Sequence, residues 1–194
     1  SHKLLGRTEI SPHVNLDVPI SPEGTHHCPG VVGGVEWNGP AYSPQTHQLY
    51  VNSVNWCGTT HLTANRFIQG SEYLDGDFVW DPPSSASGYT RGLEASTGKE
   101  LWVRHSPTPM VAGLTPTAGG VLMTGDMNGH FLVLDARSGA VLYSFQTGGA
   151  IAGGVSTYQI DGRQYVAVAS GNNSRTVWTT TGAASVVLFA LAAS

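Results

Sequence analysis

The stretches GLEASTGKELW (residues 92–102) and LVLDARSGAVLY (residues 132–143) decide the fold, because they align without a gap. In each, a glycine follows an acidic residue by four positions, and an aromatic residue follows the glycine by four more. These residues are Glu94, Gly98 and Trp102 in the first stretch, and Asp135, Gly139 and Tyr143 in the second. The offset of 41 residues lies within the roughly 40–45 residues of a four-stranded propeller blade. We expect each acidic residue and glycine to form the turn between a blade's last two strands, and each aromatic residue to pack against the next blade.

Strand-like segments elsewhere in the chain bear on the alternative, two unrelated hairpins, since turns with an acidic residue and glycine are common. Short segments rich in Val, Leu, Tyr and Phe recur, bounded by Gly, Asp, Asn or Ser. They are HQLYVNSV (47–54), GGVLMTGD (119–126), HFLVLDA (130–136), AVLYSFQT (140–147) and RQYVAVAS (163–170). The turns MNGH, RSGA and IDGR are typical of tight hairpins. Because no segment keeps a 3.6-residue apolar period over three turns, the sequence predicts an all-β fold with at most minor helix.

Composition limits the class of protein and its partners. With 194 residues, of which 40% are hydrophobic and 11% charged, the chain is long and apolar enough to fold as one ordinary domain. The formal net charge of −4 and the absence of any Lys/Arg run argue against nucleic acid or an anionic membrane as a partner. The longest apolar segment, AASVVLFALAAS (183–194), is too short to span a membrane and is expected to form a buried strand.

A family resemblance rests on these motifs taken in order. EASTGKELW and LDARSGAVLY resemble the tryptophan-docking motif, Ala-x-Asp-x-x-x-Gly-x-x-x-Trp, of the eight-bladed propellers of alcohol dehydrogenases that depend on pyrroloquinoline quinone (PQQ). The segment from Cys28 to Cys57 is similar to one in which two cysteines bracket a cofactor-lining turn, and residues 115–171 resemble the closing blades. The resemblance covers essentially the whole chain. It implies the C-terminal portion of a quinoprotein alcohol dehydrogenase.

The resemblance also implies the domain organisation, a single partial β-propeller over residues 1–194. We expect the outer strand of a truncated blade at 1–10, a blade at 38–105 with an insertion at 58–87, a compact blade at 112–147, and a last blade at 152–192 that lacks its outer strand. That is about three four-stranded antiparallel blades, whereas closed propellers have four to eight. The partner that completes the ring is therefore the rest of a parent propeller, either in one longer chain or as a separately encoded piece, or further copies of this chain through self-association.

For the two cysteines, the family resemblance implies a disulfide between Cys28 and Cys57. Closing the loop of 29 residues would contribute roughly 3–4 kcal/mol in the chain-entropy model. A persistent disulfide indicates an oxidising compartment, which for this family is the bacterial periplasm. From the residues alone, two free buried thiols remain the alternative. The run His26-His27-Cys28 is not interpreted as a metal site, because no second ligand group stands at a zinc-like spacing.

The resemblance assigns a set of cofactor-lining residues. The family commonly places a PQQ-contacting asparagine eight residues after the first cysteine, and here that position is Glu36, followed by Trp37. PQQ carries three carboxylates, so an ionised Glu36 is repelled unless a cation or a proton intervenes. Methanol-oxidising members carry a cofactor-contacting tryptophan near Val111, where valine offers no indole. The remaining assigned residues are Gly113, Gly171 and Asn172. The alternative for Glu36 and Trp37 is plain packing at the top of a blade.

Function follows from the resemblance, because no catalytic triad, phosphate loop or metal-ligand set occurs in the sequence. In the family, the catalytic aspartate and the calcium or lanthanide ligands lie upstream of these blades, so the isolated chain is expected to be inactive. The parent would oxidise an alcohol or a related hydroxy compound and pass electrons to cytochrome c or a quinone. The alternative is a non-enzymatic PQQ-like-repeat propeller that acts as a scaffold or binding module. The cysteine pair and the glycine-rich turn at Trp37 favour the enzyme.

Overall fold

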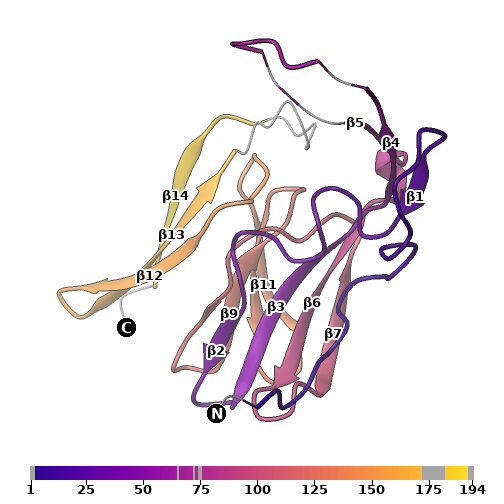
Figure 1. Cartoon of the computed structure of the whole chain (residues 1–194). Coiled ribbons are helices and arrows are strands. Elements are labelled where there is room, and N and C mark those ends of the chain that lie inside the picture. Colours follow the sequence, from indigo (N-terminus) through magenta and orange to yellow (C-terminus); the bar gives the residue numbers. More distant parts are fainter. Residues whose placement is uncertain (1–2, 65, 72, 74–75, 172–181, 192–194) are drawn as a thin grey trace.

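Antiparallel sheets make up nearly all of the regular structure. The computed structural model describes residues 3–64, 66–71, 73, 76–171 and 182–191. Within these residues the chain forms four antiparallel sheets, and the one helical element is a three-residue 3₁₀ turn, η1 (Pro83–Ser85). Figure 1 shows the sheets standing side by side along the chain. The all-β, partial-propeller fold predicted from the sequence is confirmed.

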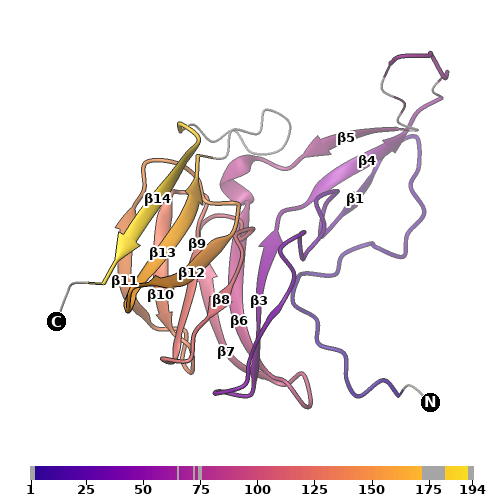
Figure 2. The same cartoon turned by 90° about the vertical axis from the view of Figure 1, so that its left-hand side faces the viewer.

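Three of the sheets follow one another along the chain, each built from its own stretch of the sequence. The first sheet has the order β2 (Ala41–Ser43), β3 (Gln48–Asn55), β6 (Ser87–Glu94), β7 (Glu100–Ser106). The second sheet has β8 (Thr115–Pro116), β9 (Val121–Gly125), β10 (His130–Asp135), β11 (Val141–Gln146). The third sheet has β12 (Val155–Ile160), β13 (Arg163–Ser170), β14 (Ser185–Ala190). In Figure 2 the third sheet stands in front of the second, which stands beside the first. Their assignment as blades with the expected boundaries stays a prediction.

The long insertion in the first sheet pairs with an earlier strand, β1 (Thr25–His27), to form a small separate sheet. This sheet consists of β1, β4 (Gly58–Leu62) and β5 (Gly76–Trp80), in the order β1-β4-β5. At the opposite end of the molecule, where we expected an outer strand over residues 1–10, the described residues 3–10 form no strand. A strand needs a neighbour to bond its backbone, and here the Thr8 hydroxyl instead donates to the carbonyl of Gly98, at 2.6 Å, in the β6–β7 turn.

The two repeat turns share a backbone hydrogen bond between the glycine and the acidic residue. The N–H of Gly98 donates to the carbonyl of Glu94, and the N–H of Gly139 donates to that of Asp135, both at 2.8 Å. Both glycines have positive φ, +76° and +72°, a conformation that side chains disfavour. In the second turn the Asp135 carboxylate also accepts from the Ser138 hydroxyl at 2.7 Å, and this bond holds the pKa of Asp135 below its usual value.

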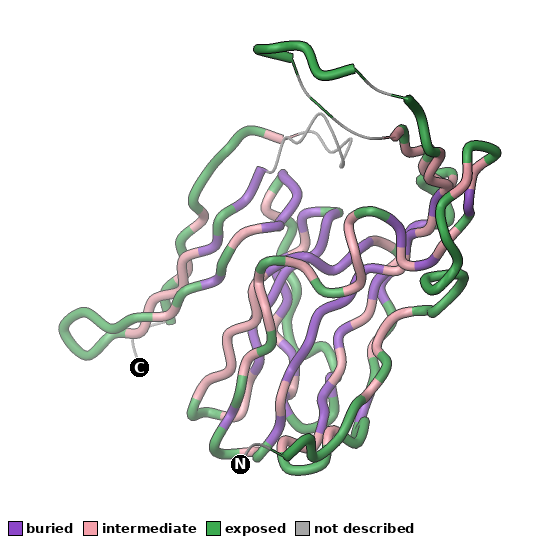
Figure 3. Tube along the Cα trace, viewed as in Figure 1, coloured by how far each residue is buried: buried purple, intermediate pink, exposed green. Residues whose placement is uncertain are grey.

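The indole of Trp102 joins the first sheet to the second. It is 9% exposed, and a Cβ placed on Gly139 would lie 2.5 Å from its ring. Its Nε1 donates to Gln48 Oε1 at 3.0 Å, so the polar edge of the ring is satisfied inside the first sheet. The cluster that surrounds it is Tyr50, Leu122, Leu132, Leu134 and Ala136. Figure 3 shows buried residues concentrated along the strands of these two sheets. Packing of this aromatic residue on the next sheet is as the sequence predicts.

Tyr143, the matching aromatic residue of the second repeat, does not pack in the same way. It is 48% exposed and lines a largely apolar groove of about 680 Å³ between the second and third sheets. The expectation that it docks like Trp102 is wrong for a structural reason. Trp102 packs on the turn between the last two strands of the second sheet, whereas Tyr143 lines the groove beside Phe131 and Phe189. Phe131 and Phe189 stack across the same interface, with ring centroids 4.8 Å apart.

Replacing Gly139 with alanine tests the docking contact. We expect Gly139→Ala to lower the free energy of unfolding by about 2–4 kcal/mol, because the new methyl group adds overpacking against Trp102 to the strain of a left-handed backbone. Gly162→Ala is the matched control, since Gly162 has φ of +79° and nothing within 4 Å of its added Cβ. Its expected cost is about 1–2 kcal/mol of backbone strain. Equal losses for the two variants in urea denaturation would contradict the docking.

Candidate functional site

The loops that precede the first strands of the first, second and third sheets (β2, β8 and β12) meet at one end of the molecule. We name them the Glu36 turn (residues 36–39), the Val111 turn (residues 110–113) and the Ala152 turn (residues 150–153). Asn38 Nδ2 donates to the carbonyl of Val111 and, at 3.0 Å, to the carbonyl of Ala152. The N–H of Gly113 donates to the carbonyl of Gly153 at 2.9 Å. The structure therefore brings the Glu36 and Val111 turns, which hold sequence-predicted residues, together with the Ala152 turn, which does not.

The Ala152 turn is the part of the site that sequence reasoning missed. A signal for it is present, because Ala112-Gly113 before β8 recurs as Ala152-Gly153 before β12. The two turns also share the core beneath them, where Val111, Ala150 and Ala152 are buried in a single cluster. The repeat that identified the turns at residues 94–98 and 135–139 thus extends to the Val111 and Ala152 turns, which lead into the second and third sheets.

A buried asparagine anchors the Val111 turn to the first two sheets. Asn52 on β3 is 7% exposed, and its Nδ2 donates to the carbonyl of Ala112 at 2.9 Å and to Thr124 Oγ1 at 3.0 Å. Its Oδ1 accepts the hydroxyl of the fully buried Thr90 at 2.7 Å. Both amide hydrogens and the carbonyl are satisfied, as a buried amide requires. Two asparagine side chains therefore hold the Val111 turn. Asn52 bonds the carbonyl of Ala112, and Asn38 bonds the carbonyl of Val111.

Among the described residues of these turns, Glu36 is the one ionisable group with an unsatisfied atom. Its Oε1 is buried and has no hydrogen-bond partner among the described residues. Burial raises the pKa of Glu36 from its ordinary value of 4.5. A small cavity lies beside it, lined by Val35, Asn38, Asn52 and residues 110–112, none of which is ionisable. The surroundings therefore shift the protonation equilibrium of this carboxyl towards the neutral acid, the form that has a hydrogen to donate.

The other sequence-predicted residues differ in how much surface they offer. Trp37 is 65% exposed beside Glu36, whereas the side chain of Val111 is 1% exposed and packs in the core. Gly113 lies so close to the third sheet that an added Cβ would be 3.3 Å from Gly154 Cα. Gly171 donates its N–H to the carbonyl of Ala150 at 2.9 Å, which links it to the Ala152 turn. Asn172 lies outside the described residues.

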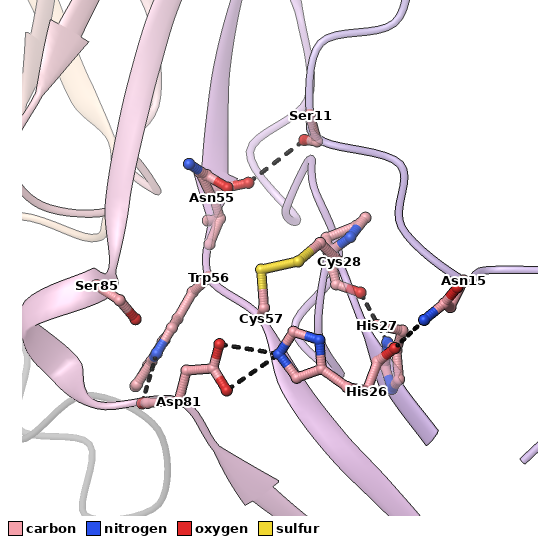
Figure 4. The surroundings of a disulfide bond; sticks show 12 residues. Ser11, Asn15, His26, His27, Cys28, Asn55, Trp56, Cys57, Asp81 and Ser85 are labelled. Carbon is pink, nitrogen blue, oxygen red and sulfur yellow. Dashed lines mark hydrogen bonds and ion pairs between the residues drawn. A yellow bond between two sulfur atoms is a disulfide. The ribbon is translucent and has the colours of Figure 1, made fainter.

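The disulfide between Cys28 and Cys57 is formed, and it anchors the loop that carries Glu36 (Figure 4). It joins the start of that loop to the end of β3, and two further backbone bonds fasten the same loop. The N–H of Gly30 donates to the carbonyl of Trp56, and that of Val54 donates to the carbonyl of Gly34, both at 2.8 Å. The Glu36 turn is therefore built on a loop that is covalently and non-covalently attached to the first sheet.

The two histidines next to Cys28 are engaged by protein groups. His26 Nε2 lies 3.0 Å from a carboxylate oxygen of Asp81, and His27 Nε2 lies 2.8 Å from Thr60 Oγ1. Over the described ranges, no three His, Cys, Asp or Glu side chains gather as ligands for a metal ion. In the same ranges, no helix is both long and apolar enough to cross a membrane.

Comparisons with known proteins agree with the resemblance carried by the docking motifs. A family model described as the PQQ glucose/ethanol/alcohol dehydrogenase β-propeller domain matches residues 72–166. A quinoprotein ethanol dehydrogenase of Pseudomonas aeruginosa is 34% identical over 160 residues, covering 79% of this chain and 26% of that protein. A lanthanide-dependent methanol dehydrogenase of Methylacidiphilum fumariolicum is 32% identical over 149 residues, covering 74% of this chain and 24% of that protein.

A solved structure shows the same fold. The quinohemoprotein alcohol dehydrogenase of Comamonas testosteroni matches with a TM-score of 0.72 at 23% identity, over 86% of this chain and 27% of that one. The chain thus spans about a quarter of the length of the relatives it matches.

The disulfide gives a prediction about thiols and stability. Thiol titration of the denatured, unreduced protein should detect no free thiol. The Cys28→Ser/Cys57→Ser double variant should lose about 3–4 kcal/mol of unfolding free energy, since the loop of 29 residues is no longer closed in the unfolded chain. Finding two titratable thiols in protein produced in an oxidising compartment would contradict this assignment.

The raised pKa of Glu36 predicts a pH-dependent stability. Because burial favours the protonated carboxyl, its contribution to folding is fully present below pH 4.5 and is lost as the pH rises through the raised pKa. We expect Glu36→Gln, which is neutral throughout, to match the wild type at about pH 4 and to become the more stable protein towards about pH 8. The exposed Glu23→Gln controls for the loss of one negative charge. A wild-type-minus-variant difference that stays constant with pH in urea denaturation would rule this out.

Proposed function

The chain belongs to the PQQ alcohol dehydrogenase β-propeller family, and on this premise we propose that the full-length protein is a PQQ-dependent dehydrogenase of which this chain lines one side of the quinone pocket. The full-length protein would oxidise an alcohol or a related hydroxy compound. The isolated chain is expected to be inactive. The observation that carries the proposal is the convergence of the Glu36, Val111 and Ala152 turns, which places the segments assigned to the cofactor at one end of the sheets.

The residues present fit PQQ when Glu36 is neutral. An ionised Glu36 would repel the three carboxylates of PQQ, but a protonated one can donate its hydrogen to a carboxylate oxygen. Its buried, unpaired Oε1 and its raised pKa support the neutral form. Desolvating an unpaired oxygen is unfavourable, so a ligand that pairs with it would be favoured. Glu36 thereby takes the place of the asparagine amide that is common at this position in the family.

Other residues would bind and orient the cofactor. Trp37 offers an exposed ring for contact with a planar group, while Val111 and Gly113 contribute backbone rather than side-chain surface. Gly171 would line the pocket from the third sheet, and Asn172 is assigned to the cofactor by the family resemblance alone. When bound, the quinone accepts the electrons of the alcohol, and the protein supplies binding, orientation and electrostatics. The calcium or lanthanide ion that accompanies PQQ would be held by residues of the full-length protein outside this chain.

Localisation and electron transfer follow from the same proposal. The formed disulfide supports an oxidising compartment, which for a bacterial protein of this family is the periplasm. Electrons would pass to a cytochrome c or a quinone acceptor. The rest of the parent propeller, or further copies of this chain through self-association, would cover the apolar surfaces that the third sheet leaves exposed, including Val186 and Leu188, which are 67% and 61% exposed.

PQQ titration of the full-length apoprotein tests the proposal. With calcium or a lanthanide present, we expect the wild type to bind PQQ and to reduce an artificial dye with an alcohol. Its affinity should fall as rising pH ionises Glu36. Glu36→Gln should keep its affinity at all pH values, because it carries no charge to repel PQQ. At alkaline pH it should therefore bind PQQ at least roughly tenfold more tightly than the wild type, a difference of about 1.4 kcal/mol.

Glu23→Gln serves as the control and should titrate like the wild type. If neither the wild type nor Glu36→Gln bound PQQ at any pH, the dehydrogenase proposal would fall. The non-enzymatic scaffold would then be the better account of the chain.

A further inference from the structure

One side chain, that of Asn38, links the three turns of the candidate site. It lies within the Glu36 turn, and its amide nitrogen donates to carbonyls of the Val111 turn and the Ala152 turn. Those partners are 73 and 114 residues away in the sequence. Among the described residues, Asn38 is thus the one whose side-chain hydrogen bonds join the turns that precede three different sheets.

Asn38 and Glu36 share one tight turn. The N–H of Gly39 donates to the carbonyl of Glu36 at 3.3 Å, closing the four-residue turn. Gly39 has φ of +45°, and it is followed directly by Pro40, which restricts the chain as it enters β2. Before this turn, the loop is attached to the first sheet through the carbonyl of Gly34. We therefore expect a displacement of Asn38 from its two carbonyl partners to shift the turn that carries the Glu36 carboxyl.

We propose that Asn38 is a positioning residue for cofactor binding, which holds the Glu36 turn at a fixed distance from the Val111 and Ala152 turns. This inference rests on the proposed function, since the site that Asn38 assembles is the proposed quinone wall. Asparagine suits the role because a primary amide donates two hydrogens from one nitrogen, and both acceptors are backbone carbonyls that cannot become donors. Asn52 does not duplicate it, because its hydrogen bonds reach the first and second sheets only.

The acceptor chemistry gives a matched pair of isosteric substitutions. Asn38→Asp keeps the shape of the side chain but, when ionised, presents oxygen to two carbonyl oxygens, so both hydrogen bonds are lost and replaced by repulsion. Asn55→Asp is the control, since Asn55 Nδ2 donates to the hydroxyl of Ser87 at 3.1 Å. That hydroxyl can rotate and donate to aspartate instead. Asn38→Ala, which removes the donors without adding a charge, serves if Asn38→Asp does not fold.

Two measurements on the full-length protein follow. Hydrogen–deuterium exchange reports the Gly113 amide, whose bond to Gly153 joins two of the turns. Titration with PQQ reports the site. We expect Asn38→Asp and Asn38→Ala to accelerate exchange around Gly113 and to weaken PQQ binding by roughly tenfold or more, as for the loss of two hydrogen bonds. Asn55→Asp should change neither. Asn55→Ala, which removes a hydrogen bond within the first sheet, should lower the unfolding midpoint without weakening PQQ binding.

The outcomes separate this inference from the proposed function. If the wild type binds no PQQ, the proposed function fails, and Asn38 is not a positioning residue for that cofactor even if exchange at Gly113 rises. If the wild type binds PQQ, two results overturn the inference while the function stands. One is unchanged PQQ affinity in the Asn38 variants, and the other is an equal loss of affinity in Asn55→Ala, which would trace the effect to stability alone.

Discussion

The contact between the Trp102 indole and Gly139 sets how the first and second sheets stack. A glycine is required there because any Cβ would occupy the space of the ring, and the tight turn that presents it needs a left-handed residue at the same position. The ring also bonds Gln48 in its own sheet, so the contact is fixed in orientation as well as distance. The contact therefore helps to fix the spacing of the first two sheets, and the Glu36 and Val111 turns are the loops that lead into these sheets.

The candidate site depends on that spacing. Asn38 and Asn52 can bond to the Val111 and Ala152 turns only because these turns lie within hydrogen-bond reach of the first sheet and the loop before it. The disulfide and the bond from Val54 to Gly34 fasten the loop that carries Glu36. A carboxyl held there without a partner costs folding free energy, and such a group is expected where a ligand completes the hydrogen bonding. The asparagine side chains of these turns thus have hydrogen-bond partners, whereas Oε1 of Glu36 has none among the described residues.

How much of this could be predicted from the sequence depended on how local the information was. Strand positions, the repeat turns and the Trp102 contact follow from hydrophobic pattern, turn chemistry and a 41-residue offset, all of which are local or periodic. The disulfide came from resemblance and not from spacing. The roles of Asn38 and Asn52 could not be predicted, because their partners are backbone carbonyls 60 to 114 residues away and any residue supplies such a carbonyl. Tyr143 misled the prediction because its motif is intact, while its ring is 48% exposed and lines an apolar groove.

The central claim is that the three inner turns form a wall of a PQQ site whose hydrogen-bond donor is a neutral Glu36. The structure of the full-length protein with PQQ bound, determined by crystallography or cryo-electron microscopy, tests it most directly. The account predicts a PQQ carboxylate within hydrogen-bond distance of the Glu36 carboxyl, with Asn38 bonded to the Val111 and Ala152 turns. PQQ bound away from these turns, or a Glu36 carboxyl directed away from the bound quinone, would contradict it.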